Sequence, residues 1–139
     1  TVRLPPGAAS ISLAGVAPQK IENSLKEHPL IEQVMIVGDG RKYAAALIVP
    51  SFENLKDWCP KNGIAFESNE QVIKEKKVIA EIEAAVDRYN ATAATWEQVK
   101  KTALLPRLWS IESGELTPSM KVKRKVVTKN FEEVIEGLF

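Results

Sequence analysis

The spacing of hydrophobic residues changes several times along the chain, and each change marks a different predicted element. Near the beginning, Ile21 and Leu25 lie four residues apart, on one face of a helix that has Pro18 in its first turn. Proline suits this position because its missing N–H would have no partner there. Pro29 ends the pattern. The sequence therefore predicts a short amphipathic helix over residues 18–28.

Two apolar runs come after this helix, at residues 34–37 and 43–49. The segment between them contains Gly38, Asp39 and Gly40, and glycine and aspartate are typical of the tight turns that join antiparallel strands. Short apolar runs bounded by turn residues are typical of strands. The two runs are therefore predicted to form a β-hairpin.

A helix is predicted directly after the hairpin. Ser51 can cap its beginning, and Pro60 and Gly63 are predicted to end it. One side of this helix is apolar and consists of Phe52, Leu55, Trp58 and Cys59. Because such a side must be buried, we expect the helix to cover the hairpin.

A longer helix is predicted next, with a possible break near residues 76–77. Ser68 and Gln71 have the spacing of a capping box at its beginning. Its apolar residues recur at steps of about 3.6 residues, and they are Val72, Ile79, Ile82, Val86 and Tyr89. This period is that of an amphipathic α-helix.

The last third of the chain predicts one more strand and a terminal helix. Thr95 and Gln98 repeat the capping-box spacing ahead of a brief turn, and "KTALLP" at residues 101–106 has the composition of a short strand. The apolar residues near the end have helical spacing, and they are Phe131, Val134, Ile135 and Leu138.

Strands and helices thus occur in mixed order, which favours an α+β fold over a doubly wound parallel sheet. We expect a small mixed or antiparallel sheet with flanking helices. The 139 residues have the length of one ordinary domain. Residues 1–15 are rich in proline, glycine, alanine and serine and are expected to be a linker, and residues 16–139 are expected to form the folded domain.

Composition excludes several function classes. The formal net charge of +1 gives no overall attraction to nucleic acid or to an anionic membrane. Cys59 is the only cysteine and His28 the only histidine, so an internal disulfide and a zinc-ligand set are excluded, and a reducing, cytoplasmic setting fits best. The longest apolar run, residues 43–49, is far shorter than the ~18 residues of a membrane span.

The stretch "GELTPSMKVKRK", at residues 114–125, gathers four cations, Lys121, Lys123, Arg124 and Lys125. Lysines alternate there with apolar residues, and Met120, Val122 and Val126 would form the apolar side of a strand. Lysines on an edge strand prevent unwanted pairing, so a charged edge strand is the general interpretation. A nucleic-acid surface is less favoured because aromatic residues are not interleaved with the cations and acidic residues lie close behind.

Two motifs occur in a specific order along the chain. The first is "APQKIE" at residues 17–22 followed by "HPLIEQV" at residues 28–34, and the second is "LTPSMKVKR" at residues 116–124. With the sequence between them they resemble the C-terminal domain of long-chain fatty-acid–CoA ligases. These are members of the AMP-forming acyl-CoA synthetase and adenylate-forming superfamily. The resemblance runs from about residue 16 to residue 139.

The resemblance implies a two-step reaction. A carboxylate attacks the α-phosphate of ATP to give acyl-adenylate and pyrophosphate, and the thiol of CoA then displaces AMP. It also implies that this domain swings between two poses on a larger N-terminal domain, which would bind the fatty acid, CoA, and ATP with its Mg²⁺.

By its place in the motif, Lys121 matches the catalytic lysine of the first step. A compact ammonium on a flexible stem can contact both the fatty carboxylate and the α-phosphate. Structural or supporting roles are expected for Lys123, Arg124 and Lys125.

Two functions from different classes remain. The favoured one is the C-terminal lid domain of an AMP-forming long-chain acyl-CoA ligase, in which the isolated chain is inactive because it has no phosphate-cradling loop. The alternative is a stand-alone binding or scaffold module that keeps the fold without the chemistry. An N-terminal region with the phosphate loop would support the first.

Overall fold

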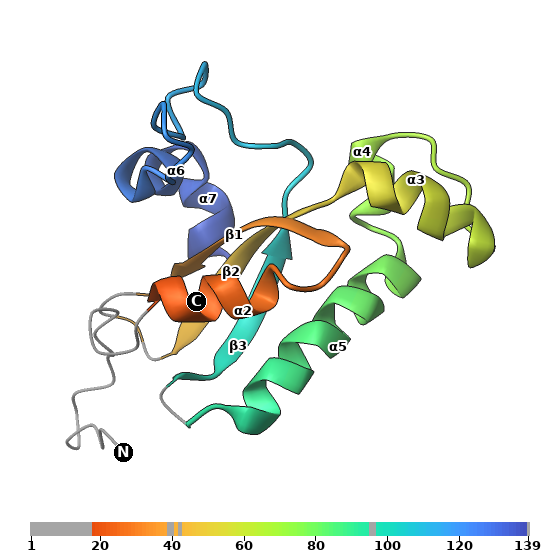
Figure 1. The fold of residues 1–139 in the computed structure, drawn as a ribbon, viewed down its shortest axis with the longest axis horizontal. Helices are drawn as coiled ribbons and strands as arrows, with labels where there is room; N and C mark the ends of the chain where they lie inside the picture. The colour runs from red at the N-terminus through yellow and green to blue at the C-terminus, as the bar shows by residue number, and fades with distance from the viewer. Residues whose placement is uncertain (1–17, 39–40, 42, 95–96, 139) are drawn as a thin grey trace.

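The computed structural model describes residues 18–38, 41, 43–94 and 97–138, and these form a three-stranded sheet with helices on both faces (Figure 1). The elements in chain order are α2 (Pro18–Leu25), β1 (Ile31–Val37), β2 (Ala44–Pro50), α3 (Phe52–Lys61), α4 (Asn69–Val72), α5 (Lys76–Thr92), β3 (Val99–Leu104), α6 (Arg124–Asn130) and α7 (Glu132–Glu136). The predicted α+β class and the small mixed sheet are confirmed. The predicted linker, Asp39 and Gly40 of the hairpin turn, and Thr95 lie outside the described residues.

The sheet has the order β1-β2-β3, with β2 antiparallel to β1 and parallel to β3. Leu47 in the centre of β2 is the partner of Met35 on one side and of Ala103 on the other. The antiparallel pair confirms the predicted hairpin, although β1 begins at Ile31, earlier than predicted. A parallel pair needs a crossover connection, and α3, α4 and α5 provide it between β2 and β3.

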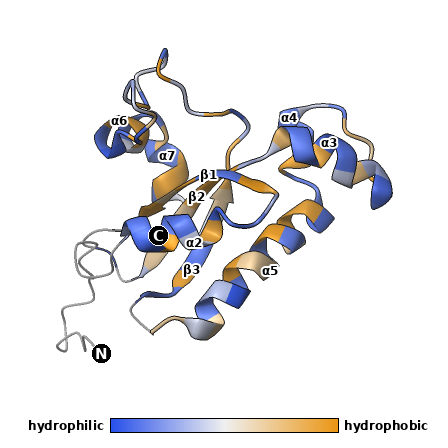
Figure 2. Ribbon diagram, in the orientation of Figure 1, coloured by the Kyte–Doolittle hydropathy of each residue, from blue (hydrophilic) through white to orange (hydrophobic). Residues whose placement is uncertain are grey.

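Every side chain of β2 is buried, and alternate residues point into two separate cores. Ile48 lies in the first core, which α2 and α5 cover together with residues of α3 and α4. Leu47 lies in the second core, which is covered by the chain after β3 and by α6 and α7. Figure 2 shows the apolar strands between helices whose outer surfaces are largely polar.

Ser51 caps α3 as predicted, since its hydroxyl accepts a 3.3 Å hydrogen bond from the backbone N–H of Asn54. The helix ends at Lys61, between the two residues that were predicted to end it. Gly63 has the positive φ, +75°, that is typical just after a helix end, whereas Pro60 lies inside the last turn and does not itself end the helix. The position of α3 also differs from the prediction. The first face is crossed by α2 and α5, and α3 reaches the same core from beyond the end of β2 (Figure 1).

The predicted long helix is broken, as its sequence suggested. Ser68 caps α4 by accepting from the N–H of Gln71 at 3.1 Å, while the Gln71 side chain accepts from Glu67 instead of closing a reciprocal capping box on Ser68. The chain then leaves the helix, and α5 begins at Lys76, which confirms the predicted break. Val78, not Ile79, is buried in the first core, so the buried face of α5 is shifted by one residue at this end.

The predicted terminal helix is present as α7, and two contacts fasten it to the hairpin. The phenol of Tyr43 donates to the carbonyl of Leu138 at 2.6 Å, and Arg41 forms an ion pair with Glu136. Ile135 and Leu138 are buried in the second core as predicted. Val134 is 39% exposed, so it lies outside the buried face.

We expect Ile48→Ala to lower the free energy of unfolding by about 2–5 kcal/mol, because Ile48 is fully buried in the central strand and its loss leaves a cavity. The measurement is urea unfolding followed by circular dichroism. Val134→Ala is the control, and it should change the free energy by less than about 0.5 kcal/mol since surface substitutions usually do. Equal effects of the two substitutions would contradict the complete burial of β2.

Candidate functional site

The cationic stretch that begins at Lys121 does not form the edge strand that its alternating pattern predicted. Only an isolated bridge pairs Leu116 with Val122, and α6 begins at Arg124. Met120, predicted on the apolar side of that strand, is 63% exposed. The pattern failed because the segment doubles back on itself and then becomes helical, so neighbouring residues do not share one strand.

Lys121 lies at the end of a three-residue hairpin loop. The backbone N–H of Thr117 donates to the carbonyl of Lys121 at 2.8 Å, and the N–H of Met120 donates to the carbonyl of Thr117 at 2.7 Å. The Thr117 hydroxyl accepts from the N–H of Lys121 at 3.1 Å. Pro118 takes the second position of this turn, where its fixed φ is favourable. Threonine and proline of the motif thus define the loop.

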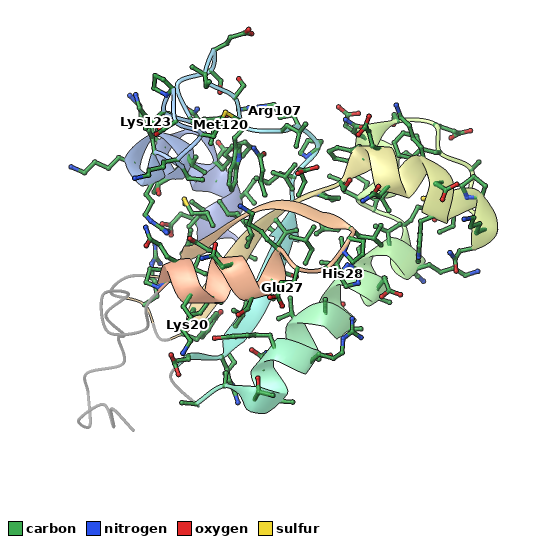
Figure 3. All side chains as sticks on the ribbon, in the orientation of Figure 1. Lys20, Glu27, His28, Arg107, Met120 and Lys123 are labelled. Carbon is green, nitrogen blue, oxygen red and sulfur yellow. The ribbon has the colours of Figure 1, made fainter. Side chains whose placement is uncertain are left out.

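Met120 has a φ of +66°, the left-handed region that non-glycine residues seldom adopt. A three-residue hairpin loop needs this conformation at its last position. The strain is typically about 1–3 kcal/mol and is found at functional sites. Lys121 comes directly after it and is exposed, and within the described part of the chain its ammonium makes no hydrogen bond or ion pair. Figure 3 shows Met120 and Lys123 on the side of the molecule that carries α6, away from α5.

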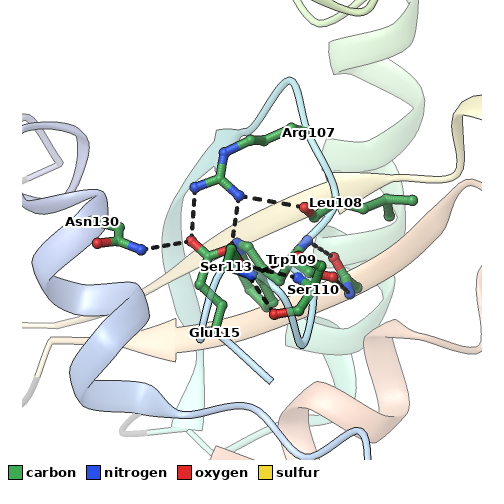
Figure 4. A network of polar contacts seen from close by, with 8 residues as sticks. Arg107, Leu108, Trp109, Ser110, Ser113, Glu115 and Asn130 are labelled. Atoms are coloured by element: carbon green, nitrogen blue, oxygen red, sulfur yellow. Dashed lines mark hydrogen bonds and ion pairs between the residues drawn. The ribbon is translucent and has the colours of Figure 1, made fainter. Parts of the chain in front are cut away.

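A buried carboxylate lies at the base of this loop. Glu115 is fully buried, and its two oxygens accept from the guanidinium of Arg107 at 2.7 and 2.8 Å. The hydroxyl of Ser113 donates to it at 2.7 Å, and the amide of Asn130 donates at 3.0 Å (Figure 4). A buried charge is tolerated only when it is paired and hydrogen-bonded, and Glu115 meets this condition.

Two opposing effects act on the pKa of Glu115. Burial raises it, but the hydrogen bonds from Arg107, Asn130 and Ser113 favour the charged form more strongly, so the pKa lies below its ordinary value. The hydrogen bond to Glu115 likewise raises the pKa of Arg107. The pair is therefore ionised at neutral pH.

A second carboxylate connects the two sequence motifs. The carboxylate of Glu22, on α2, accepts from the Arg124 guanidinium at 2.6 and 2.9 Å and from the backbone N–H of Ile36 at 2.7 Å. Ile36 lies on the edge strand β1, whose outer N–H groups need partners. Arg124 thus has the structural role that was expected for it, and it fixes the start of α6 against α2.

The other predicted residues are not brought together with Lys121. Lys123 and Lys125 are exposed at the start of α6. His28 contacts Glu81 at 3.3 Å and accepts from the N–H of Leu30, in keeping with a role at the end of a helix. Cys59 is buried in the first core as a small hydrophobic residue. Burial, and to a smaller extent the negative charge of Glu75, raise the pKa of its thiol.

Sequence reasoning missed Glu22, Arg107, Glu115 and Asn130 as parts of the structure around the loop. A signal was available for two of them. Glu22 and Glu115 are acidic residues inside the quoted motifs, each next to a residue of a buried core, Ile21 and Leu116. Arg107 and Asn130 have no such signal, because only the fold brings them to Glu115.

Two further properties of the described residues bear on the site. No three of their metal-ligating side chains lie close enough together to hold a metal ion. None of the described helices is both long and apolar enough to cross a membrane.

The fold is that of the C-terminal domains of adenylate-forming enzymes. The adenylation domain of a carboxylate reductase from Mycobacterium chelonae superposes with a TM-score of 0.70 at 22% identity, over 92% of this chain and 19% of that chain. The adenylation and carrier didomain of carboxylic acid reductase from Segniliparus rugosus, solved in complex with AMP, superposes with a TM-score of 0.67 at 20% identity, over 86% of this chain and 15% of that one.

The family itself is given by the sequence. The model of the AMP-binding enzyme C-terminal domain matches residues 14–139, and the chain belongs to this family. Long-chain-fatty-acid–CoA ligase FadD15 of Mycobacterium tuberculosis is 39% identical over 125 residues, which are 89% of this chain and 21% of that protein. Human long-chain-fatty-acid–CoA ligase 1 is 34% identical over 128 residues, 89% of this chain and 18% of that protein. The chain thus spans about a fifth of the length of these relatives.

The stability of the domain should depend on pH through Glu115. Because its folded-state pKa is lowered, its charged network contributes stability above the unfolded pKa, near 4.3 for glutamate, and loses it as the pH falls through the folded pKa. We expect Glu115→Gln to have a lower free energy of unfolding than the unchanged chain at pH 7. The difference between the two free energies should decrease as the pH falls from about 5 to 3. Urea midpoints over this range measure it. A difference that is independent of pH would show that the charge of Glu115 is not involved.

Proposed function

We propose that this chain is the mobile C-terminal domain of an AMP-forming long-chain fatty-acid–CoA ligase and that Lys121 is its catalytic residue. The observation that carries the proposal is the loop of Lys121, which presents an exposed ammonium at the end of a hydrogen-bonded hairpin. Family membership and the fatty-acid–CoA ligases among the relatives support the reaction class.

The proposed chemistry is the transfer of an adenylyl group. The fatty carboxylate attacks the α-phosphate of ATP, the bond to pyrophosphate breaks, and acyl-adenylate forms; the thiol of CoA then attacks the acyl carbon and AMP leaves. In the first step two anions approach each other. The Lys121 ammonium would contact both of them and offset the charge that develops, which is the main contribution a protein makes to phosphoryl transfer.

The loop geometry suits this role in two ways. Lysine is a compact charge on a flexible stem, so it can reach a substrate bound by another domain. The backbone of Lys121, in contrast, is held in place by the N–H and the hydroxyl of Thr117. With its backbone fixed and its side chain flexible, Lys121 can bring its ammonium into an active site and withdraw it when the domain moves.

The substrates and partners are part of the same proposal. Fatty acid, CoA, and ATP with its Mg²⁺ would be bound mainly by the N-terminal domain of the same enzyme, with this domain as its lid. Support comes from the share of the relatives that this chain spans and from the lack of a phosphate-cradling glycine-rich loop in its sequence. We also propose that the enzyme acts in the cytoplasm, in line with its single, buried cysteine. The linker at residues 1–15 stays a prediction.

In the full-length enzyme, Lys121→Ala should slow acyl-adenylate formation by at least about 10²–10³-fold, the scale seen when one preorganised electrostatic donor is removed. Lys121→Arg should not restore the rate, because a planar guanidinium places its charge differently. Exchange of labelled pyrophosphate into ATP, driven by fatty acid, measures this step.

The matched controls are Lys123→Ala and Lys125→Ala, which remove exposed cations next to the loop and should cost far less. Thioester formation from synthetic acyl-adenylate and CoA should be nearly unchanged in all these variants, since the domain turns a different face to the site in the second step. The proposal is wrong if Lys121→Ala leaves adenylation intact or damages both steps equally. The second outcome would show that Lys121 only supports the fold.

The isolated chain should bind ATP only weakly, because its sequence has no phosphate-cradling loop. Isothermal titration calorimetry with MgATP measures this directly. A micromolar dissociation constant for the isolated chain would contradict the division of roles between the two domains.

A further inference from the structure

We propose that Arg107 is a positioning residue for the adenylation step, acting through Glu115 on the loop that carries Lys121. The inference rests on the proposed function of Lys121 and adds a residue outside the lysine motif. Arg107 comes after β3 in the sequence and lies 14 positions before Lys121, so the fold alone brings it to the base of the loop.

Glu115 connects three segments of the chain. Arg107 comes from the chain after β3, Ser113 from the turn just before the loop, and Asn130 from the end of α6. All three donate to the same fully buried carboxylate (Figure 4). A change at any of them therefore reaches Glu115.

Backbone contacts connect Glu115 to the loop of Lys121. The backbone carbonyl of Glu115 accepts from the N–H of Lys123 at 2.8 Å, and the next pair, Leu116 and Val122, forms the isolated bridge. Glu115 thus holds both strands at the base of the hairpin. A displacement of the Glu115 backbone moves the carbonyl that accepts from the N–H of Lys123. It thereby also shifts the backbone of Lys121, two residues earlier in the same strand of the hairpin.

The segment that carries Arg107 is anchored at two points. Its guanidinium lies over the ring of Phe131, 4.9 Å from the centroid. Two residues further on, the N–H of Trp109 donates to the side chain of Gln33 at 2.7 Å, and the Gln33 amide donates to the Trp109 carbonyl at 3.0 Å. The two hydrogen bonds with Gln33 tie the segment to β1. The segment that carries Arg107 is therefore fixed to the sheet, and the Arg107 side chain connects this segment to Glu115 at the base of the loop.

A stabilising role alone explains this arrangement poorly. Glu115 is fully buried, but the Arg107 side chain is 47% exposed, so only one side of the pair is buried. Exposed ion pairs contribute little to stability, and replacing even a buried pair with apolar residues often stabilises a protein. The pair is therefore weak evidence for stability, and fixing a unique arrangement is the best-attested use of such pairs. Arg107 forms two parallel bonds with Glu115, which set an orientation as well as a distance. A misplacement of about 1 Å at a catalytic group can cost 10²-fold in rate.

The experiment is a double-mutant cycle in the full-length enzyme, with the two half-reactions measured separately. Arg107→Ala should slow adenylation by about 10- to 100-fold and leave thioester formation from acyl-adenylate within about 3-fold. In the Lys121→Ala background, Arg107→Ala should cause almost no further loss, because the two residues act as one unit. Arg88→Ala is the matched control, because it removes an exposed arginine from α5, which covers the first core on the other face of the sheet. It should leave both steps unchanged.

Two further variants keep the test informative if Arg107→Ala does not yield folded enzyme. Arg107→Lys retains the charge and loses the two-pronged geometry, and Asn130→Ala removes only the bond from α6. Each should slow adenylation by about 3- to 10-fold and show the same lack of additivity with Lys121→Ala.

The possible failures are distinguishable. If Lys121→Ala leaves adenylation intact, the proposed function fails first. If Lys121→Ala slows adenylation but the Arg107 variants do not, or slow both half-reactions equally, or add fully to Lys121→Ala, then Arg107 is only a structural residue and the inference is wrong.

Discussion

The structure depends on the complete burial of its central strand. No side chain of β2 is exposed, so both faces of a sheet of only three strands must be covered. The crossover between β2 and β3 covers one face with α5. The other face has to be covered by the chain after β3, and this draws residues 105–138 back over the sheet (Figure 1). The position of the lysine loop is a consequence of that second covering layer.

Two carboxylates hold this second layer in place. Glu22 pairs with Arg124 and accepts the outer N–H of Ile36, so it satisfies the sheet edge and fixes the start of α6 with one group. Glu115 pairs with Arg107 and holds the base of the hairpin loop. The helices themselves are short, and isolated helices of such length have little stability in water. Specific polar contacts therefore define where this layer sits.

The four cations of the stretch have different surroundings, which explains why they cluster in a nearly neutral chain. Arg124 is neutralised by Glu22, and Lys123 and Lys125 face solvent at the first turn of α6. Lys121 lies on a loop that its own backbone bonds keep closed. The cluster of cations in the sequence thus contains one arginine with a structural role and three exposed lysines. One of these lysines, Lys121, is positioned for the proposed chemistry.

Local sequence determined most elements of this protein: the caps at Ser51 and Ser68, the break before α5 and the apolar runs of the hairpin depend on neighbouring residues alone. The motif also identified Lys121 as the candidate. Only the tertiary structure decided that the alternating cations form a turn and a helix instead of a strand, and that Arg107 and Asn130 converge on Glu115. The reason is physical. Caps and periodicity act over a few residues, whereas the partner of a buried charge is chosen by which segments the two cores bring together.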